Sequence, residues 1–314
     1  MMKRSLLACA ALAALLGGAL GAAHAAGKAP APLKKGYKLV WFQNFAAMTK
    51  DSQLSVSANG PCGPGGTTWM AHKPGGGDWF TFQDPKGHDK PFGVGNGYLT
   101  IRVQKDGQDP HNWFDGYSGG ILASVDGQGH GFSQQYGYFE CCMQTPAAPN
   151  TWPSFWLLDE PSLVNKKLDH CAELDVMESY GNWGTGPNQN PPGQPYWDST
   201  TWHDWGMNGN ATDAKGSYVK EPGMTTGFHT YGIDIEPDTT TWYFDRKPVW
   251  TQPTIDAAKR PMFVLLNLAL GGGTHHNADG SNYDWNLTPD PTDLKVKYVA
   301  VWASPNSPNY AGAH

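Results

Sequence analysis

Three acidic residues lie within six positions, in the run Glu173-Leu174-Asp175-Val176-Met177-Glu178. In a regular β-strand, Glu173 and Asp175 would point to the same face, and position 177 rather than Glu178 would join them. A β-bulge at Val176-Met177 would absorb the extra residue and return Glu178 to the acidic face, with the Leu and Val of the run pointing to the core. The spacing therefore predicts a bulged strand with three carboxylates along one edge of a cleft.

Carboxylates placed this closely repel one another, and one of them tends to keep its proton. Retaining glycoside hydrolysis uses such a set, because it needs an ionised nucleophile and a protonated general acid about 5–5.5 Å apart. Glu173 and Glu178 could lean toward one sugar from opposite ends, and Asp175 between them could hold a proton or orient the nucleophile. A solvated acidic strand and a calcium site are the alternatives. The aromatic run Trp152-Pro-Ser-Phe-Trp156 ahead of the acids favours catalysis.

The elements that must position these acids are short segments of strand character separated by turns. Several alternate between apolar and polar residues, as Leu99, Ile101 and Val103 do with their neighbours. The predicted strands are Lys38–Phe45, Tyr98–Gln104, Gly119–Ser124, Tyr136–Thr145, Ser154–Leu158, Glu173–Ser179, Thr230–Ile235, Thr240–Phe244, Met262–Leu270 and Lys295–Trp302. The only helix candidate is Asp256–Lys259. Because this spacing leaves little room for crossover helices, an all-β antiparallel sandwich is predicted, with the cleft rimmed by loops such as Gly181–Gln194.

Composition agrees with that architecture and limits the partners. The 314 residues include 39 Gly, 25 Pro and 14 Trp with only 16% charged residues, which is typical of short strands joined by many turns. A balance of 22 Lys and Arg against 28 Asp and Glu, a net charge of -6, gives no electrostatic reason to expect nucleic acid or an anionic membrane as partner. A neutral polysaccharide fits better. We expect a monomer with no cofactor, and no spacing of Cys and His matches a structural zinc site.

The N-terminus has the order of a signal peptide. Met1-Met2-Lys3-Arg4 precedes an apolar run that ends in Ala23-His24-Ala25. We expect cleavage near Ala25 and a secreted protein, extracellular or periplasmic, because no later stretch is apolar enough to span a membrane. The predicted organisation is a signal peptide at residues 1–25, a linker at 26–36, one catalytic domain at 37–303 and a C-terminal tail at 304–314.

Four cysteines remain after cleavage, Cys62, Cys141, Cys142 and Cys171. In an exported protein they can oxidise in any of three full pairings, and the sequence leaves the pairing open. Cys141 and Cys142 would face opposite sides of a strand, which makes a bond between those two the least favoured.

The sequence resembles glycoside hydrolase family 16, in particular the members whose bulged catalytic strand carries Glu-x-Asp-x-x-Glu. Besides the acidic motif, the resemblance rests on the order and spacing of Gly97–Ile101, Tyr117–Ile121, Tyr136–Glu140, Trp152–Leu158, Tyr231–Ile235, Trp242–Asp245, Leu266–Gly272 and Tyr298–Val301. It implies a concanavalin A-like β-jelly-roll with a concave cleft and retaining cleavage of internal β-linkages in polysaccharides. It also implies Glu173 as nucleophile, Glu178 as acid and base, and Asp175 as the assisting carboxylate.

Several residues qualify as substrate contacts. Trp152, Trp156 and Trp183 are candidates for stacking on sugar rings, and Trp156, which alternates with Phe155, is the one best suited to the core. His203 lies in a segment that resembles the strand beside the catalytic one in the family, where its imidazole could hydrogen-bond Asp175 or a sugar hydroxyl.

One departure from the family concerns metal binding. Lys297 stands where many relatives carry an Asp that resembles a ligand of a structural calcium ion. Calcium takes oxygen ligands, which a lysine cannot supply. We therefore expect no calcium at that position and no metal in the site.

The resulting hypothesis is a secreted, endo-acting hydrolase that degrades a β-1,3- or β-1,3/1,4-glucan. A β-galactan hydrolase for agar-like or carrageenan-like polymers and a transglycosylase are the alternatives within the same chemistry. From other classes, a non-catalytic lectin-like domain and a surface adhesin remain. The acidic pair argues against the lectin, since a binder has no need of repelling carboxylates. The Trp152–Trp156 run argues against the adhesin.

Overall fold

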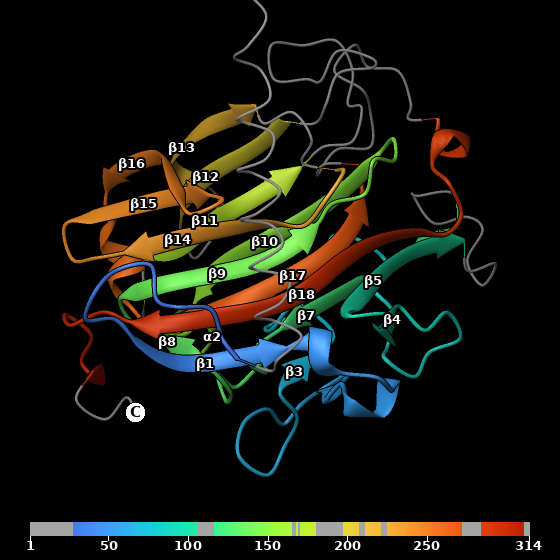
Figure 1. The fold of residues 1–314 in the computed structure, drawn as a ribbon, viewed down its shortest axis with the longest axis horizontal. Coiled ribbons are helices and arrows are strands. Elements are labelled where there is room, and N and C mark those ends of the chain that lie inside the picture. The colour runs from blue at the N-terminus through green and yellow to red at the C-terminus, as the bar shows by residue number, and fades with distance from the viewer. Residues whose placement is uncertain are drawn as a thin grey trace, which may run out of the picture.

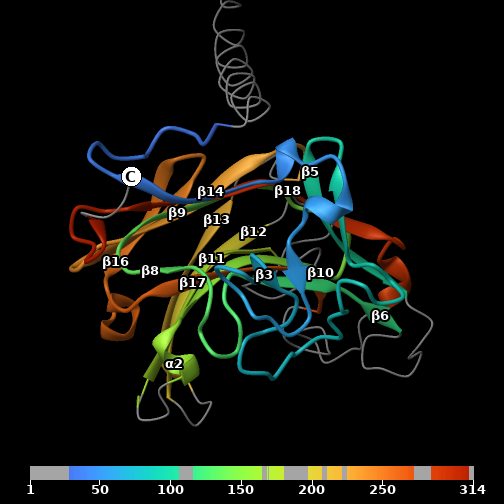
Figure 2. The same cartoon turned by 90° about the horizontal axis from the view of Figure 1, so that it is seen from below.

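The computed structural model describes residues 28–105, 116–164, 168, 170–179, 197–206, 211–220, 225–271 and 284–310. Its strands form two sheets that pack face to face (Figure 1). Figure 2 shows strands of the first sheet, among them β9, β14 and β18, above β10, β11 and β17 of the second. Nearly all neighbouring strands are antiparallel, with β2 and β3 a short parallel pair. The predicted all-β antiparallel sandwich is thus confirmed.

The two sheets have these orders. The first sheet contains β16 (Lys247–Pro253), β15 (Thr239–Phe244), β14 (His229–Ile235), β9 (Gly137–Gln144), β18 (Thr292–Ala303), β5 (Tyr98–Lys105) and β4 (Phe92–Gly95), with β1 (Lys38–Asn44) beside β18 and β6 (Tyr117–Ser118) beside β5. The second sheet contains β13 (Ala211–Lys220), β12 (Trp197–Gly206), β11 (His170–Ser179), β10 (Thr151–Asp159), β17 (Met262–Leu270), β7 (Gly120–Ala123), β3 (Trp69–Met70) and β2 (Val56–Ser57), with β8 (Ser133–Gln134) beside β17.

The alternation read from the sequence sets the core between the sheets. Leu99, Ile101 and Val103 on β5 are fully buried in it, while the residues between them are partly exposed. Cys141 of β9 also lies in this core, whereas Cys142 packs in a second cluster with Tyr138, Tyr298 and Trp302. The two cysteines therefore face opposite sides of the strand, as predicted. Cys62, Cys141, Cys142 and Cys171 are all free thiols in the structure.

Helices are few and short. Asp256–Lys259 forms the predicted turn of helix, as the 3-10 helix η3. The prediction that it is the only helix is wrong, because Pro161–Val164 forms α2, where proline suits the first helical turn. The 3-10 helices η1 (Phe45–Ala47), η2 (Asp51–Gln53) and η4 (Trp285–Leu287) complete the set in the described residues. None of the helices in these parts of the chain has the length and apolar character needed to cross a bilayer.

The segments expected to be linker and tail contact the domain where the structure describes them. Lys34 pairs with Asp234 of β14 through its ammonium group. At the other end Ser307 is buried, and the amide of Asn309 donates to the Gln134 side chain at 3.0 Å. Both ends of the chain are thus packed against the sandwich for at least part of their length.

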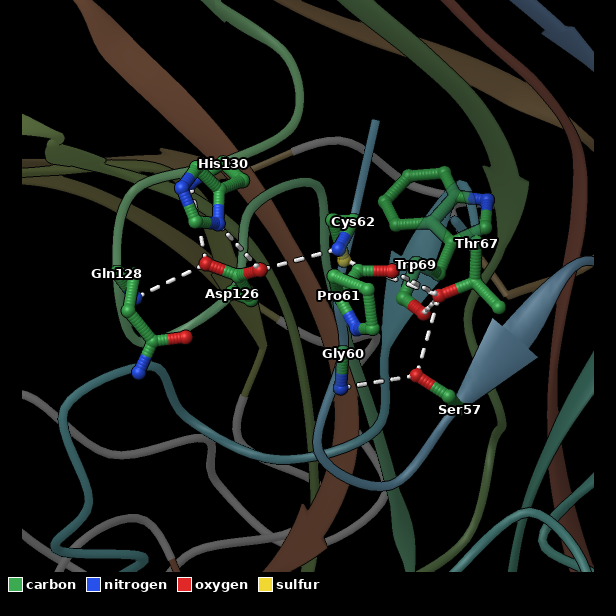
Figure 3. A network of polar contacts seen from close by, with 9 residues as sticks. All are labelled: Ser57, Gly60, Pro61, Cys62, Thr67, Trp69, Asp126, Gln128 and His130. Atoms are coloured by element: carbon green, nitrogen blue, oxygen red, sulfur yellow. Dashed lines mark hydrogen bonds and ion pairs between the residues drawn. The ribbon is translucent and has the colours of Figure 1, made fainter. Parts of the chain in front are cut away.

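A buried carboxylate joins two loops beside the second sheet (Figure 3). Asp126 is fully buried and accepts backbone N–H groups from Cys62 at 3.0 Å, Gln128 at 2.9 Å and His130 at 3.0 Å. Three backbone donors compensate the lost hydration of the charge. The loop that carries Cys62 is therefore fixed to the turn that follows Val125.

A second buried carboxylate lies in the first sheet. Glu140 of β9 accepts two hydrogen bonds from the Arg246 guanidinium and one each from the hydroxyls of Tyr138 and Tyr298, all at 2.8 Å. The Glu140 side chain is fully buried, so this bidentate pair with two further donors is what makes its charge tolerable there.

Replacing Arg246 with Met should leave the Glu140 charge buried without its counter-ion. We expect the free energy of unfolding, measured by urea denaturation, to fall by about 3–5 kcal/mol. The matched control is Arg102→Met, which breaks a bidentate pair with Asp293 whose side chains are 37% and 25% exposed. That loss should stay below about 1 kcal/mol. Equal losses in the two variants would contradict the argument.

Candidate active site

Strand β11 contains the predicted bulge. Across to β10, Phe155 pairs with Met177 and Trp156 with Asp175, so Val176 has no partner. Across to β12, the register shifts between Asp175 and Glu178 in the same way. The bulge between the second and third acids of the motif is confirmed.

The bulge divides the strand between core and cavity. Leu174, Val176 and Met177 are buried in the core between the sheets. Glu173, Asp175 and Glu178 instead line one cavity of about 480 Å³. The structure thus brings the three predicted acids together, on the face opposite the core.

Tryptophans from two segments form the walls of this cavity. Trp152 and Trp156 of β10 line it, together with Trp79 from the loop after β3. Trp79 packs edge-on against Trp156 with ring centroids 5.4 Å apart, and lies 5.9 Å from Trp152 in a tilted arrangement. Trp156 is only 5% exposed and belongs to the core, as the sequence favoured, and its stacking on a sugar ring stays a prediction. Trp183, the remaining stacking candidate, lies outside the described residues.

Indole N–H groups hold two of the acids. Trp152 Nε1 donates to Glu178 Oε1 at 2.9 Å, and Trp205 Nε1 of β12 donates to Glu173 Oε2 at 3.1 Å. The bond from Trp205 acts to lower the pKa of Glu173. Each of the two glutamates therefore has its own donor on a neighbouring strand.

His203 of β12 completes the acidic face. It pairs with Glu173 in the β11–β12 register, and its Nε2 lies 3.3 Å from Asp175 Oδ2, at ion-pair distance but without the hydrogen bond that the sequence analysis considered. Its ring is stacked on Trp205, with centroids 5.1 Å apart and planes inclined by 20°. The imidazole is thus oriented toward the middle carboxyl group of the motif.

Burial and mutual repulsion set the protonation of these acids. Burial, with repulsion from Asp175 and Glu178, raises the pKa of Glu173 to about 8, while His203 and the Trp205 indole act to lower it. Burial also raises the pKa of Asp175 well above its ordinary value, with repulsion from Glu178 adding to it. The cluster therefore keeps at least one proton at neutral pH. A proton on Asp175 removes its repulsion of Glu173 and allows that carboxyl group to ionise.

The same groups are the described residues best placed to hold a metal ion. Glu173, Asp175 and His203 each offer one ligand atom, and these atoms lie within 4.8 Å of one another. Metal ligands must be deprotonated, whereas burial here favours the protonated carboxyl groups. The donor set suits proton sharing better than a cation, and the expectation of a site without metal stays a prediction.

Several cavity residues had not been identified from the sequence. Asn267 accepts a hydrogen bond from Trp156 Nε1 at 2.8 Å, and its position as the one polar residue of Met262–Leu270 was an available signal. Trp205 alternates with His203 along β12, and this alternation was a second available signal. Lys73, Trp79 and Ser154 also line the cavity and had no such signal.

Comparison with known proteins places this geometry in context. The model of the family described as glycosyl hydrolases family 16 matches residues 87–287. The chain is 29% identical over 274 residues to the endo-1,3-1,4-beta-glycanase EglC of Rhizobium meliloti (strain 1021), covering 83% of this chain. It is also 29% identical over 225 residues to the endo-1,3-1,4-beta-glycanase ExsH of the same strain, covering 70% of this chain. The matched regions are 51% and 41% of those two proteins, so the chain spans about half of their length or less.

Solved structures agree on the fold. The catalytic domain of an endo-1,3-beta-glucanase (laminarinase) from Thermotoga petrophila RKU-1 superposes with a TM-score of 0.59 at 20% identity, covering 86% of this chain and 99% of that one. A laminarinase from Flavobacterium sp. UMI-01 gives a TM-score of 0.57 at 22% identity, covering 84% of this chain and 100% of that one. The sandwich described above is thus the predicted jelly-roll.

The raised pKa of Glu173 has a consequence for stability. Because its folded pKa of about 8 exceeds the ordinary value of 4.5, the native state retains a proton that the unfolded chain releases. The associated stability is fully present below about pH 4.5 and is lost as the pH rises toward about 8. We expect Glu173→Gln to be more stable than the parent by about 2–4 kcal/mol at about pH 8, with the difference vanishing near about pH 4.5.

Urea denaturation of both proteins at the two pH values checks this expectation. The exposed carboxylate of Asp256, paired only with Lys259 on the surface, supplies the control. Asp256→Asn should leave the free energy of unfolding unchanged at either pH. A Glu173→Gln protein that is no more stable than the parent at the higher pH would refute the argument.

Proposed function

This chain belongs to glycosyl hydrolases family 16, and from that premise we propose that it cleaves internal linkages of a β-1,3- or β-1,3/1,4-glucan with retention of configuration. The observation that carries the proposal is the bulge of β11, which brings Glu173, Asp175 and Glu178 to one cavity walled by tryptophans. The similarity to the two Rhizobium meliloti glycanases supports the choice of substrate.

In the proposed reaction, Glu173 is the nucleophile. Its carboxylate attacks the anomeric carbon and forms a glycosyl ester as the bond to the leaving oxygen breaks, and Glu178 gives that oxygen its proton. Glu178, now ionised, then takes a proton from water, and the resulting hydroxide attacks the anomeric carbon and releases Glu173. The Trp205 N–H and the nearby His203 support the ionised form of Glu173 that this role requires.

Asp175 is proposed as the proton reservoir between the two glutamates. It is 2% exposed, and burial together with repulsion from Glu178 keeps its pKa high. A protonated Asp175 lowers the charge next to Glu173 and leaves the nucleophile free to ionise before substrate binds. His203, 3.3 Å away, is proposed to orient this carboxyl group and to contact sugar hydroxyls.

Aromatic stacking is proposed as the basis of sugar binding. Trp152 and Trp156 line the cavity, and an indole face matches the apolar face of a pyranose ring. Trp183 is proposed as a third contact. The substrate is a neutral polymer, in keeping with the net charge of -6.

We also propose that the protein is exported and acts as a monomer. The basic start, apolar run and Ala23-His24-Ala25 ending support cleavage of residues 1–25 near Ala25, and release outside the cytoplasm. The catalytic domain is proposed to include residues 37–303, together with the segments before and after it that pack on the sandwich.

A panel of laminarin, mixed-linkage glucan, agarose, carrageenan and xyloglucan tests the substrate. We expect new reducing ends and oligosaccharides from laminarin or the mixed-linkage glucan, with the β-anomer appearing first in proton NMR. Glu173→Gln should lower kcat on the same polymer by at least about a hundredfold. Retention of a polymer without cleavage would favour the lectin interpretation, and cleavage of agarose or carrageenan alone would replace the substrate class.

The separate roles of the two glutamates need a second assay. On an aryl β-glucoside oligomer with an activated leaving group, Glu178→Ala should still form the glycosyl ester, because that leaving group needs no proton. Added azide should then rescue turnover and give a β-glycosyl azide. With Glu173→Ala, azide should replace the nucleophile and give the α-product. The reverse pattern would exchange the two assignments.

A further inference from the structure

One wall of the cavity is formed by the loop from Ala71 to Asp84, called the rim loop below. It follows β3 and supplies Lys73, Gly77 and Trp79 to the cavity. Between Lys73 and Asp78 it contains Gly75, Gly76 and Gly77, which have φ values of 83°, 83° and 77°. Glycine adopts these positive φ values at little steric cost, but a run of three glycines loses much backbone entropy when it is ordered. The far end of the loop is fixed by the buried Phe80 and Phe82 and by backbone hydrogen bonds to Gly119, which leaves the glycine run as the part that needs a further contact to hold it.

His72 provides such a contact. Its Nδ1 lies 2.7 Å from Asp78 Oδ2 and its Nε2 lies 2.9 Å from Asp84 Oδ1. The second oxygen of Asp78 accepts the backbone N–H of Lys73 at 2.9 Å. One imidazole ring thus joins the start of the rim loop to its middle and to its end.

This arrangement requires the imidazolium form of His72. A neutral imidazole has one N–H donor, so its second nitrogen would direct a lone pair at a carboxylate oxygen. The charged ring donates from both nitrogens and gives two charge-assisted hydrogen bonds. Loss of the proton would release Asp78 or Asp84 and open one side of the closed loop.

The contacts of His72 with Asp78 and Asp84, called the clamp below, act on the site through Trp79. This residue directly follows Asp78 in the chain and packs against both Trp152 and Trp156. Trp152 in turn donates its N–H to Glu178. A displaced Trp79 would alter the aromatic wall on which a sugar stacks, and would remove packing from the indole that holds Glu178.

Several of the other charged groups around the rim loop have partners of their own. Lys73 donates from Nζ to the Gly76 carbonyl at 3.1 Å, within the loop. In the segments packed nearby, Asp126 is bound by backbone N–H groups and by His130, and Glu178 is bound by Trp152. The charges on the loop and on these neighbouring segments are Lys73, Asp78, Asp84, Asp126, His130, Glu160 and Glu178.

We propose that His72, as an imidazolium, is a positioning residue that holds the rim loop closed over the substrate, so that glucan binding weakens when His72 loses its proton. This inference rests on the proposed function of the cavity. The hydrogen bond to Asp78 raises the pKa of His72 above 6.5, burial opposes it, and the bond to Asp84 adds to the rise. The clamp is therefore complete at low pH and is lost as the pH rises through that raised pKa.

The test measures binding without catalysis. In a Glu173→Gln background, the Kd for laminarihexaose is determined by calorimetry from about pH 5.5 to about pH 9. With His72 present, Kd should rise about threefold to tenfold toward the alkaline end. A change of this size corresponds to the loss of one or two partly exposed charged hydrogen bonds. With His72→Gln added, binding should be weak throughout, and that alkaline rise should be absent. The groups that titrate in both proteins cancel in this comparison.

Two further variants make the result specific. Asp84→Asn removes the partner whose side chain is 61% exposed, so the protein should fold, and the alkaline rise in Kd should move to lower pH. His88→Gln is the matched control, since His88 is 70% exposed and pairs with Asp89 alone, outside the rim loop. Its profile should equal that of the background protein.

The outcomes separate the two proposals. Binding with the same pH dependence with or without His72, or an Asp84→Asn profile that does not move, would overturn the inference and leave the glucanase proposal standing. No binding by any of the proteins at any pH would overturn the glucan proposal and the inference together.

Discussion

The structure depends on a repulsion: three carboxyl groups lie on one buried stretch of strand and cannot all be charged. Burial raises the pKa of both Glu173 and Asp175, and repulsion between the carboxyl groups adds to the rise. Solvent would relieve the repulsion, but partial burial weakens that screening and strengthens the interactions among the acids. His203 and the two indole donors offset part of the negative charge of these acids but not all of it.

The bulge connects this chemistry to the hydrophobic core. Val176 adds one residue to the strand, and it turns inward together with Leu174 and Met177. From the opposite sheet, Trp242 donates its indole N–H to the backbone carbonyl of Asp175 at 2.9 Å, deep in the interior. Core packing therefore fixes the register that places the acids. A change of register by one residue would exchange the two faces and bury carboxylates where the apolar residues now lie.

The sequence predicted what is encoded locally and missed what only the fold brings together. The acids, the bulge and the alternation of β5 follow from spacing, because a strand has a fixed side-chain period. Strand β13 was absent from the predicted set, and β12 was anticipated only through the resemblance of the segment around His203. The places of β12 beside β11 and of β13 beside β12 are set by tertiary pairing. Trp79 reaches the cavity from a glycine-rich loop nearly a hundred residues before the motif, and no local pattern marks it.

Buried carboxylates in this protein are stabilised in two opposite ways. Asp126 and Glu140 are fully buried and receive several donors each, and the backbone bonds of Asp126 lower its pKa despite burial. Glu173 has an indole donor, and its pKa rises to about 8. A group that is fully compensated is fixed in one protonation state, whereas a partly compensated one can exchange a proton near neutral pH. The stability given up at Glu173 therefore accompanies a carboxyl group that can ionise near neutral pH, as the proposed nucleophile must.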